Sequence, residues 1–170
     1  PIKVLVVDDS ALIRQILSEI VTRDPGLTLV GAAPDAYVAK RMVQEFRPDV
    51  ITLDIEMPKV DGLRFLEVMM KAMPTPVVMI STLTERGADA TLRALELGAV
   101  DFMAKPKLGV AQGMAEYAAV IVEKIKAAAH SRLGQPTQTR CTKHASMRYT
   151  GTEKLIGIGA STGGLSLIHI

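Results

Sequence analysis

Five short apolar runs without polar alternation mark the N-terminal part of the chain. Such aliphatic, β-branched runs are typical of strands buried on both faces of a parallel sheet. Apolar residues recur with helical spacing between them, and capping or breaking residues such as Ser10, Asp35, Asp61 and Gly98 bound the helical stretches. The pattern predicts an α/β fold with a five-stranded, parallel, doubly wound sheet. The strands are expected at residues 2–7, 27–33, 50–53, 77–80 and 99–104, and the helices at about residues 11–23, 36–46, 63–73, 85–97 and 111–130.

The pattern changes after residue 130. Residues 131–153 combine Gln, Pro and Thr with basic side chains and show no apolar periodicity, which is typical of an exposed linker. An apolar run then leads into Gly-Ala-Ser-Thr-Gly-Gly at residues 159–164. We therefore expect a first domain at residues 1–130, a basic polar linker at 131–153, and the first strand of a second α/β domain within 154–164.

Charge is divided unevenly between these parts. Residues 1–130 carry 15 Lys/Arg against 17 Asp/Glu, whereas residues 131–170 carry 5 against 1, so the net charge of +2 comes from the C-terminal part. This asymmetry argues against nucleic-acid binding by the chain as a whole. No apolar run is long enough to span a membrane, and the single cysteine, Cys141, fits a reducing compartment. We expect a cytoplasmic protein that neither inserts into a membrane nor binds nucleic acid.

Chemically competent side chains follow four of the predicted strands. They are Asp8 and Asp9, then Asp54, Ser81 and Lys105. The carboxyl ends of parallel strands lie at one edge of the sheet, where open α/β sheets bind their ligands. Several carboxylates in one pocket require a cation or must take up protons.

This arrangement predicts phosphoryl transfer to a carboxylate. Asp54 is the candidate nucleophile, because an aspartyl phosphate is an established covalent intermediate. Asp9, Asp54 and the main-chain oxygen of Glu56 are candidate Mg²⁺ ligands, with Asp8 acting through water. Lys105 would supply a fixed positive charge and Ser81 a hydroxyl donor to a phosphoryl oxygen.

Each of these residues also has an ordinary structural interpretation. An acidic pair before a helix is often a cap, and a strand-end Asp is often a turn residue. Ser81 and Lys105 are uninformative when taken singly. The functional interpretation depends on their occurrence together, in order, on successive strand ends.

The same motifs resemble those of two-component response-regulator receiver domains over residues 2 to about 130. The resemblance implies a flavodoxin-like, CheY-like fold, Asp54 as phosphoacceptor, and a chemotaxis or other histidine kinase as donor. It also implies a switch in which Ser81 moves toward the phosphoryl group and Phe102 turns inward. Glu56 departs from the many receivers with a smaller or uncharged residue there, which leaves the phosphoryl lifetime open. The matching segments are Leu5-Val6-Val7-Asp8-Asp9-Ser10, Asp54-Ile55-Glu56-Met57-Pro58-Lys59-Val60-Asp61-Gly62 and Lys105-Pro106.

Other segments are similar to the chemotaxis protein-glutamate methylesterases. These are Leu83-Thr84, residues 91–102, Lys105-Pro106-Lys107 and residues 159–164. The resemblance implies that Ser161 is an esterase nucleophile in a parent protein that demethylates chemoreceptor glutamates and deamidates glutamines. A Ser on a Gly-flanked turn between a strand and a helix projects its oxygen beside free backbone N–H groups. We expect the receiver to occlude this esterase until it is phosphorylated.

Two other classes of protein remain as alternatives. A DNA-binding regulator would continue after the linker with a helix-turn-helix, which the strand and Gly-Ser turn at residues 155–164 argue against. A stand-alone phosphorelay module would need neither the linker nor Ser161.

The 170-residue chain itself is expected to lack esterase activity. A serine hydrolase needs a base for the nucleophile's proton, and His130, His144 and His169 lie at a receiver helix end, in the linker and in the last six residues. Those six residues, 165–170, can be encoded by CTG-TCT-CTT-ATA-CAC-ATC, which matches a transposon-end sequencing adapter. We expect a gene fragment with a non-native tail at 165–170; a divergent natural terminus is the alternative.

Overall fold

The computed structural model describes residues 1–57, 60–82, 85–106, 111–131, 158–161 and 164–167. The chain divides into two units, Pro1–Gly134 and Gln135–Ile170. Several segments with sequence predictions lie outside the described residues, namely Pro58-Lys59, Leu83-Thr84, Lys107, residues 132–157, residues 162–163 and residues 168–170. No described helix is both long and apolar enough to cross a membrane.

The first unit holds a five-stranded parallel sheet. Its strand order is β2-β1-β3-β4-β5, and every neighbouring pair is parallel. Chain order and sheet order differ because the chain returns to the centre after β2, as in doubly wound sheets. The predicted fold class is confirmed. The strands are β1 (Ile2–Val7), β2 (Leu27–Ala33), β3 (Val50–Asp54), β4 (Val77–Ser81) and β5 (Asp101–Ala104).

Four helices connect successive strands of the sheet and a fifth follows the last strand. Local side chains determine where several of them begin. Ser10 caps the first helix by accepting from the Ile13 N–H, Asp35 caps the second, and the Asp61 carboxylate accepts from the Leu63 N–H. Gly98 has a φ of +106°, the left-handed conformation that favours glycine after a helix end. The helices are α1 (Ala11–Arg23), α2 (Ala36–Phe46), α3 (Gly62–Ala72), α4 (Glu85–Glu96) and α5 (Ala111–His130).

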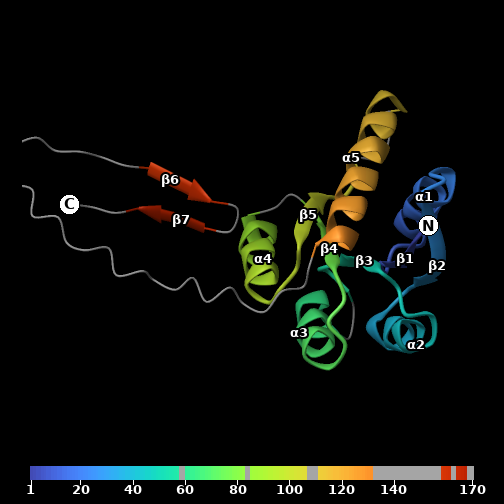
Figure 1. Ribbon diagram of the computed structural model, residues 1–170, viewed down its shortest axis with the longest axis horizontal. Helices are drawn as coiled ribbons and strands as arrows, with labels where there is room; N and C mark the ends of the chain where they lie inside the picture. Colours follow the sequence, from blue (N-terminus) through green and yellow to red (C-terminus); the bar gives the residue numbers. More distant parts are fainter. Residues whose placement is uncertain (58–59, 83–84, 107–110, 132–157, 162–163, 168–170) are drawn as a thin grey trace, which may run out of the picture. The chain divides into compact units, whose positions relative to one another are not determined.

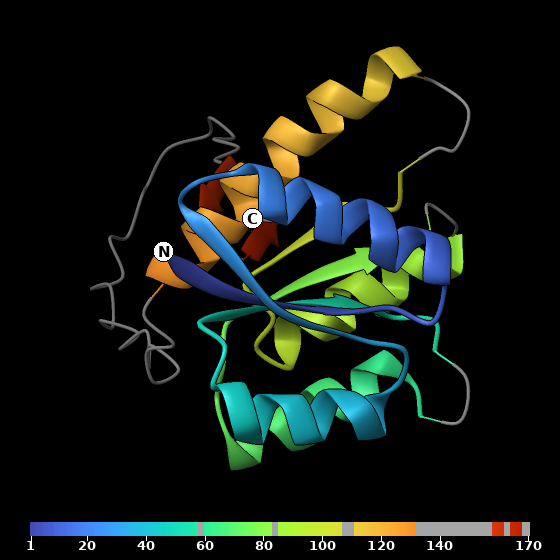
Figure 2. The same ribbon diagram turned by 90° about the vertical axis from the view of Figure 1, so that its right-hand side faces the viewer.

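Helices cover both faces of the sheet, so the core consists of two apolar layers. One layer packs side chains of α1 and α5 against β1, β3 and β4, and the other packs α2, α3 and α4 against the opposite face. Figures 1 and 2 show α1 and α5 on one side of the sheet and α2 and α3 on the other. Alternate residues of each central strand enter different layers, which is why the central strands carry continuous apolar runs. Among the described residues, the buried acidic side chains are Asp8 and Asp54, at the carboxyl ends of β1 and β3.

β3 and β4 each extend one residue beyond the predicted strands, to Asp54 and Ser81. Two further details of the first unit differ from the sequence prediction. The fifth strand begins at Asp101 rather than Ala99, because the Ala99 N–H donates to the Ala94 oxygen and so completes the helix end. Phe46 belongs to the helical apolar pattern of residues 36–46, but its side chain is 37% exposed because it occupies the last position of α2. Neither difference moves a strand end of the candidate site.

The second unit contains a two-stranded antiparallel hairpin. β6 (Ile158–Ser161) pairs with β7 (Gly164–Leu167), and Ser161 lies opposite Gly164. The strand-to-helix turn that the resemblance implies around Ser161 in the parent protein is not seen in residues 158–161 and 164–167 of this chain. Part of this second strand, residues 165–167, belongs to the tail expected to be non-native.

Candidate functional site

The carboxyl edge of the sheet brings Asp54, Asp8 and Lys105 into contact. Asp54 is the last residue of β3, whereas Asp8 and Lys105 directly follow β1 and β5. The parallel register aligns these strand ends. The backbone N–H of Lys105 also donates to the main-chain oxygen of Ser81 at 2.8 Å. Lys105 Nζ lies 2.8 Å from Asp54 Oδ2 and 3.3 Å from Asp8 Oδ2. One ammonium group thus contacts two carboxylates from different strands.

Backbone N–H groups hold the other oxygens of the two buried carboxylates. Asp8 and Asp54 are fully buried, and their Oδ1 atoms accept from the Ser10 and Glu56 N–H groups at 2.9 and 3.1 Å. Asp9 is exposed at the rim. Oxygens of the three carboxylates lie within 4.8 Å of one another. The cluster thus combines two anchored, buried carboxylates with a third that faces solvent.

Burial governs the electrostatics of the pocket. Burial raises the pKa of Asp54 to about 6, reinforced by the Asp8 charge and opposed by the hydrogen bond from Lys105. Burial likewise raises the pKa of Asp8, although Lys105 opposes this rise. For Lys105, burial lowers the pKa, but the hydrogen bond and charge of Asp54 together with Asp8 outweigh it and raise the pKa overall. Because Asp8 and Asp54 are two buried carboxylates and Lys105 is one cation, a further positive charge in the pocket would be stabilising.

The donor set fits a hard divalent cation. Asp8 Oδ2 is buried and has no hydrogen-bond donor among the described residues, although Lys105 lies near it. Buried polar oxygens in native proteins almost always have a partner, and an ion can supply one. Mg²⁺ prefers carboxylate and carbonyl oxygens, which are the groups available at this edge. The residues present therefore suit Mg²⁺ better than a metal that prefers His or Cys ligands.

The other residues predicted from the sequence lie at varying distances from this cluster of carboxylates. Ser81 is buried at the end of β4, next to the site, whereas Phe102 on β5 is 44% exposed. The exposed Glu56 accepts a hydrogen bond from Thr82 Oγ1 at 3.1 Å. Ser161 belongs to the other unit, and only its backbone is described. The structure thus brings together the acidic residues, Lys105 and Ser81, but gives no site geometry for Ser161.

Three features of the site were missed in the sequence. Arg14 on α1 contacts the main-chain oxygens of both Asp8 and Asp9, and Thr82 contacts Glu56. The third is Gly62, where an added Cβ would lie 2.0 Å from the Asp54 main-chain oxygen. Only Gly allows this close approach. The Asp-Gly pair at 61–62 was a visible signal of the turn, whereas the contacts of Arg14 and Thr82 had none.

Comparison with known proteins agrees with this geometry. Residues 4–111 match the model of the response regulator receiver domain. The chain belongs to this family. Its receiver is also similar to a solved structure described as the response regulator domain of Thermotoga maritima CheB, with 44% identity and a TM-score of 0.69 over 77% of this chain and 98% of that one. One chain in a solved structure of the P1 domain of CheA3 in complex with CheY6 from R. sphaeroides is 30% identical, with a TM-score of 0.62 over 75% of this chain and 98% of that one.

Some relatives are about twice as long as this chain. The chain is 58% identical to a protein-glutamate methylesterase/protein-glutamine glutaminase 2 of Pseudomonas aeruginosa, over 96% of this chain and 47% of the relative. It is 59% identical to the protein of that name in Shewanella oneidensis, over 98% of this chain and 49% of the relative. The receiver is thus of the type found in these methylesterases. The chain spans about half the length of the curated relatives it matches.

Proposed function

We propose that Asp54 accepts a phosphoryl group from a chemotaxis histidine kinase and that this modification controls a methylesterase domain. The observation that carries the proposal is the environment of Asp54: a buried carboxylate with Lys105 Nζ at 2.8 Å, inside a cluster of three carboxylates. Membership of the receiver family and similarity to methylesterases support it.

The positions of these side chains support the following transfer reaction. An Asp54 oxygen attacks phosphorus, the P–N bond of the donor phosphohistidine breaks, and the departing imidazole takes up a proton. Lys105 balances negative charge on the transferring group, and the Ser81 hydroxyl donates to one of its oxygens. Asp54 must be ionised to attack, and at neutral pH it is ionised because its pKa of about 6 lies below the solvent pH.

Asp8, Asp9, Asp54 and the main-chain oxygen of Glu56 would hold Mg²⁺, with Asp8 acting through water. When bound, the ion offsets the repulsion among the carboxylates and the charge of the phosphoryl group. The fit rests on the oxygen donors and on the buried Asp8 Oδ2 that lacks a hydrogen-bond donor among the described residues.

The switch would begin at Ser81 and end at Phe102. Movement of Ser81 toward the phosphoryl group opens space along β4, and the exposed Phe102 ring on the paired strand β5 turns inward. The free energy of the change comes from the new contacts of the phosphoryl group, which the unphosphorylated state lacks. Glu56, exposed beside Asp54, would influence how quickly water reaches the phosphoryl group.

The parent protein would be a cytoplasmic esterase that acts on methylated chemoreceptors, with Ser161 as nucleophile and glutamine deamidation as a related activity. The support is the similarity to proteins named for both activities. We propose that residues 1–130 gate this domain through the linker at 131–153, and that the 170-residue chain alone has no esterase activity.

Transfer from a phosphorylated histidine kinase tests the receiver function. We expect radiolabelled phosphoryl to pass from the kinase histidine to the chain when Mg²⁺ is present and not when EDTA replaces it. Asp89→Asn, which removes an exposed carboxylate from α4, is the matched control and should accept label normally. Transfer that proceeds equally well in EDTA would contradict the metal-dependent mechanism.

Removal of the receiver from the parent protein tests the gating. Deleting residues 1–130 should raise basal methanol release from methylated receptor, because the deletion removes the domain that covers the esterase. Ser161→Ala in the same deletion protein is the control and should release none. A basal rate that is unchanged or lower would rule out simple inhibition by the receiver.

A further inference from the structure

Arg14 holds the loop that carries two of the three clustered carboxylates. Its Nη1 atom donates to the main-chain oxygen of Asp8 at 2.8 Å and to that of Asp9 at 2.9 Å. The Arg14 N–H in turn donates to the Ser10 oxygen within the first turn of α1. A single guanidinium thereby ties the end of β1 and the start of α1 together.

The orientation of the Asp9 carboxylate depends on the backbone of this loop more than that of the Asp8 or Asp54 carboxylate does. The carboxylates of Asp8 and Asp54 each receive a backbone N–H and contact Lys105. Among the described residues, no donor contacts the exposed Asp9 carboxylate. The direction of the Asp9 carboxylate therefore depends on the conformation of the Asp9 backbone, and Arg14 fixes that backbone by donating to its main-chain oxygen.

Helix stability alone gives no reason for an arginine at this position. Residue 14 ends the first turn of α1, where the helix dipole disfavours a cation. Its charge also lies near a cluster that is expected to bind another cation. The two short hydrogen bonds to the loop are the favourable interactions that the structure records for this side chain.

We propose that Arg14 is a positioning residue that orients Asp9 for binding of a divalent cation. The inference rests on the Mg²⁺ site of the proposed function, and it concerns how that site is pre-organised rather than which residues are its ligands. Partners that orient metal ligands typically change metal affinity tenfold or more when they are removed.

The sign of the effect separates positioning from simple electrostatics. Removing a positive charge near an acidic cluster should strengthen cation binding if charge is all that matters. If Arg14 instead fixes the conformation of the loop that carries Asp8 and Asp9, its removal should weaken cation binding. Arg14→Met, which keeps much of the side-chain length without the charge, therefore gives opposite results under the two explanations.

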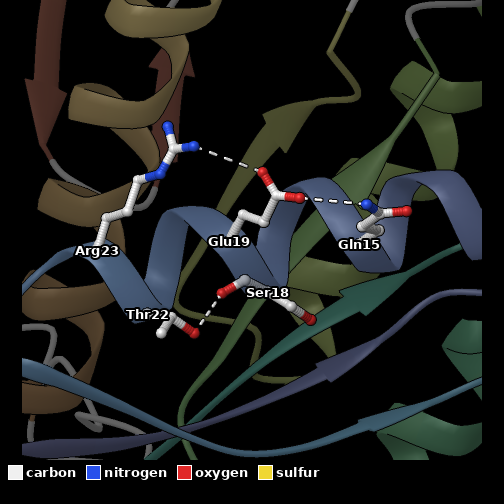
Figure 3. A pocket seen from close by; sticks show the side chains of 5 residues that line it. All are labelled: Gln15, Ser18, Glu19, Thr22 and Arg23. Carbon is white, nitrogen blue, oxygen red and sulfur yellow. Dashed lines mark hydrogen bonds and ion pairs between the residues drawn. The ribbon is translucent and has the colours of Figure 1, made fainter.

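The experiment titrates the full 170-residue chain with Mg²⁺ by calorimetry and with Mn²⁺ by electron paramagnetic resonance. We expect Arg14→Met to weaken binding by about tenfold. Arg14→Lys, which keeps a donor with shorter reach, should weaken it less and guards against misfolding of the first variant. Arg23→Met is the matched control, because Arg23 lies on the same helix, is 80% exposed and contacts only Glu19 at 3.6 Å among the residues drawn in Figure 3.

A double-mutant cycle with Asp9→Asn shows whether Arg14 acts through Asp9. Arg14→Met should have little further effect on binding once Asp9 is neutral, whereas a general structural role would persist. Unchanged or tighter binding by both Arg14 variants, or an undiminished effect in the Asp9→Asn background, would overturn the inference. If the wild-type chain fails to bind either ion, or Asp54→Asn binds as tightly as wild type, the Mg²⁺ site itself is wrong.

Discussion

Without divalent cations at neutral pH, Asp54→Asn should raise the free energy of unfolding by about 2 to 3 kcal/mol. The pKa of Asp54 rises from an ordinary value of 3.8 to about 6 in the folded protein, chiefly through burial. Each unit of pKa shift corresponds to about 1.4 kcal/mol between the protonation states. The ionised carboxylate is therefore a destabilising group that Asn replaces with a neutral amide of nearly the same shape.

The pH dependence of this effect has a definite sign. Because the folded state binds the Asp54 proton more tightly than the unfolded state, the stability that this carboxyl group contributes is complete below about pH 4 and is lost as the pH rises toward 6. The difference between Asp54→Asn and wild type should thus be small at pH 4, grow up to about pH 6 and then level off.

Urea unfolding followed by circular dichroism, in EDTA and across this pH range, measures the difference. Asp89→Asn removes the same charge from an exposed position of α4 and should change stability little at any pH. Added Mg²⁺ should narrow the gap, because an ion that binds the folded wild type stabilises it. If Asp54→Asn were less stable than wild type, or if the difference in unfolding free energy did not vary with pH, the Asp54 carboxylate would not be the destabilising group described here.

Much of the receiver could be predicted from sequence because its signals are local or follow from sheet geometry. Buried parallel strands require continuous apolar runs, and Ser10, Asp35 and Asp61 cap helices through contacts with their nearest neighbours. Once a parallel sheet is predicted, the residues after its strands must meet at one edge. The proximity of Asp8, Asp54 and Lys105 follows from that rule alone.

The features that were missed depend on long side chains and on burial. No pattern in the sequence shows that Arg14 bends back to two carbonyl oxygens, or that Thr82 reaches Glu56 across two strand ends. The raised pKa of Asp54 depends on complete burial, which sequence position does not specify. Near Ser161, a Gly-rich turn between two apolar stretches suits a hairpin as well as a strand-to-helix turn, and the described residues form a hairpin.

The most direct test of the central claim is where the phosphoryl group goes. The chain is incubated with acetyl phosphate and Mg²⁺, and its intact mass and peptides are analysed by mass spectrometry. Asp54 is the expected acceptor because it is the buried strand-end carboxylate in contact with Lys105. Asp89→Asn is again the control that should accept the group normally.

Asp54→Asn should remain folded, since it is expected to be more stable than wild type, so its failure to react cannot be attributed to unfolding. Wild type should gain the mass of one phosphoryl group, located on the peptide that contains Asp54, whereas Asp54→Asn should gain none. Full labelling of Asp54→Asn, together with loss of labelling in Asp8→Asn or Asp9→Asn, would contradict it.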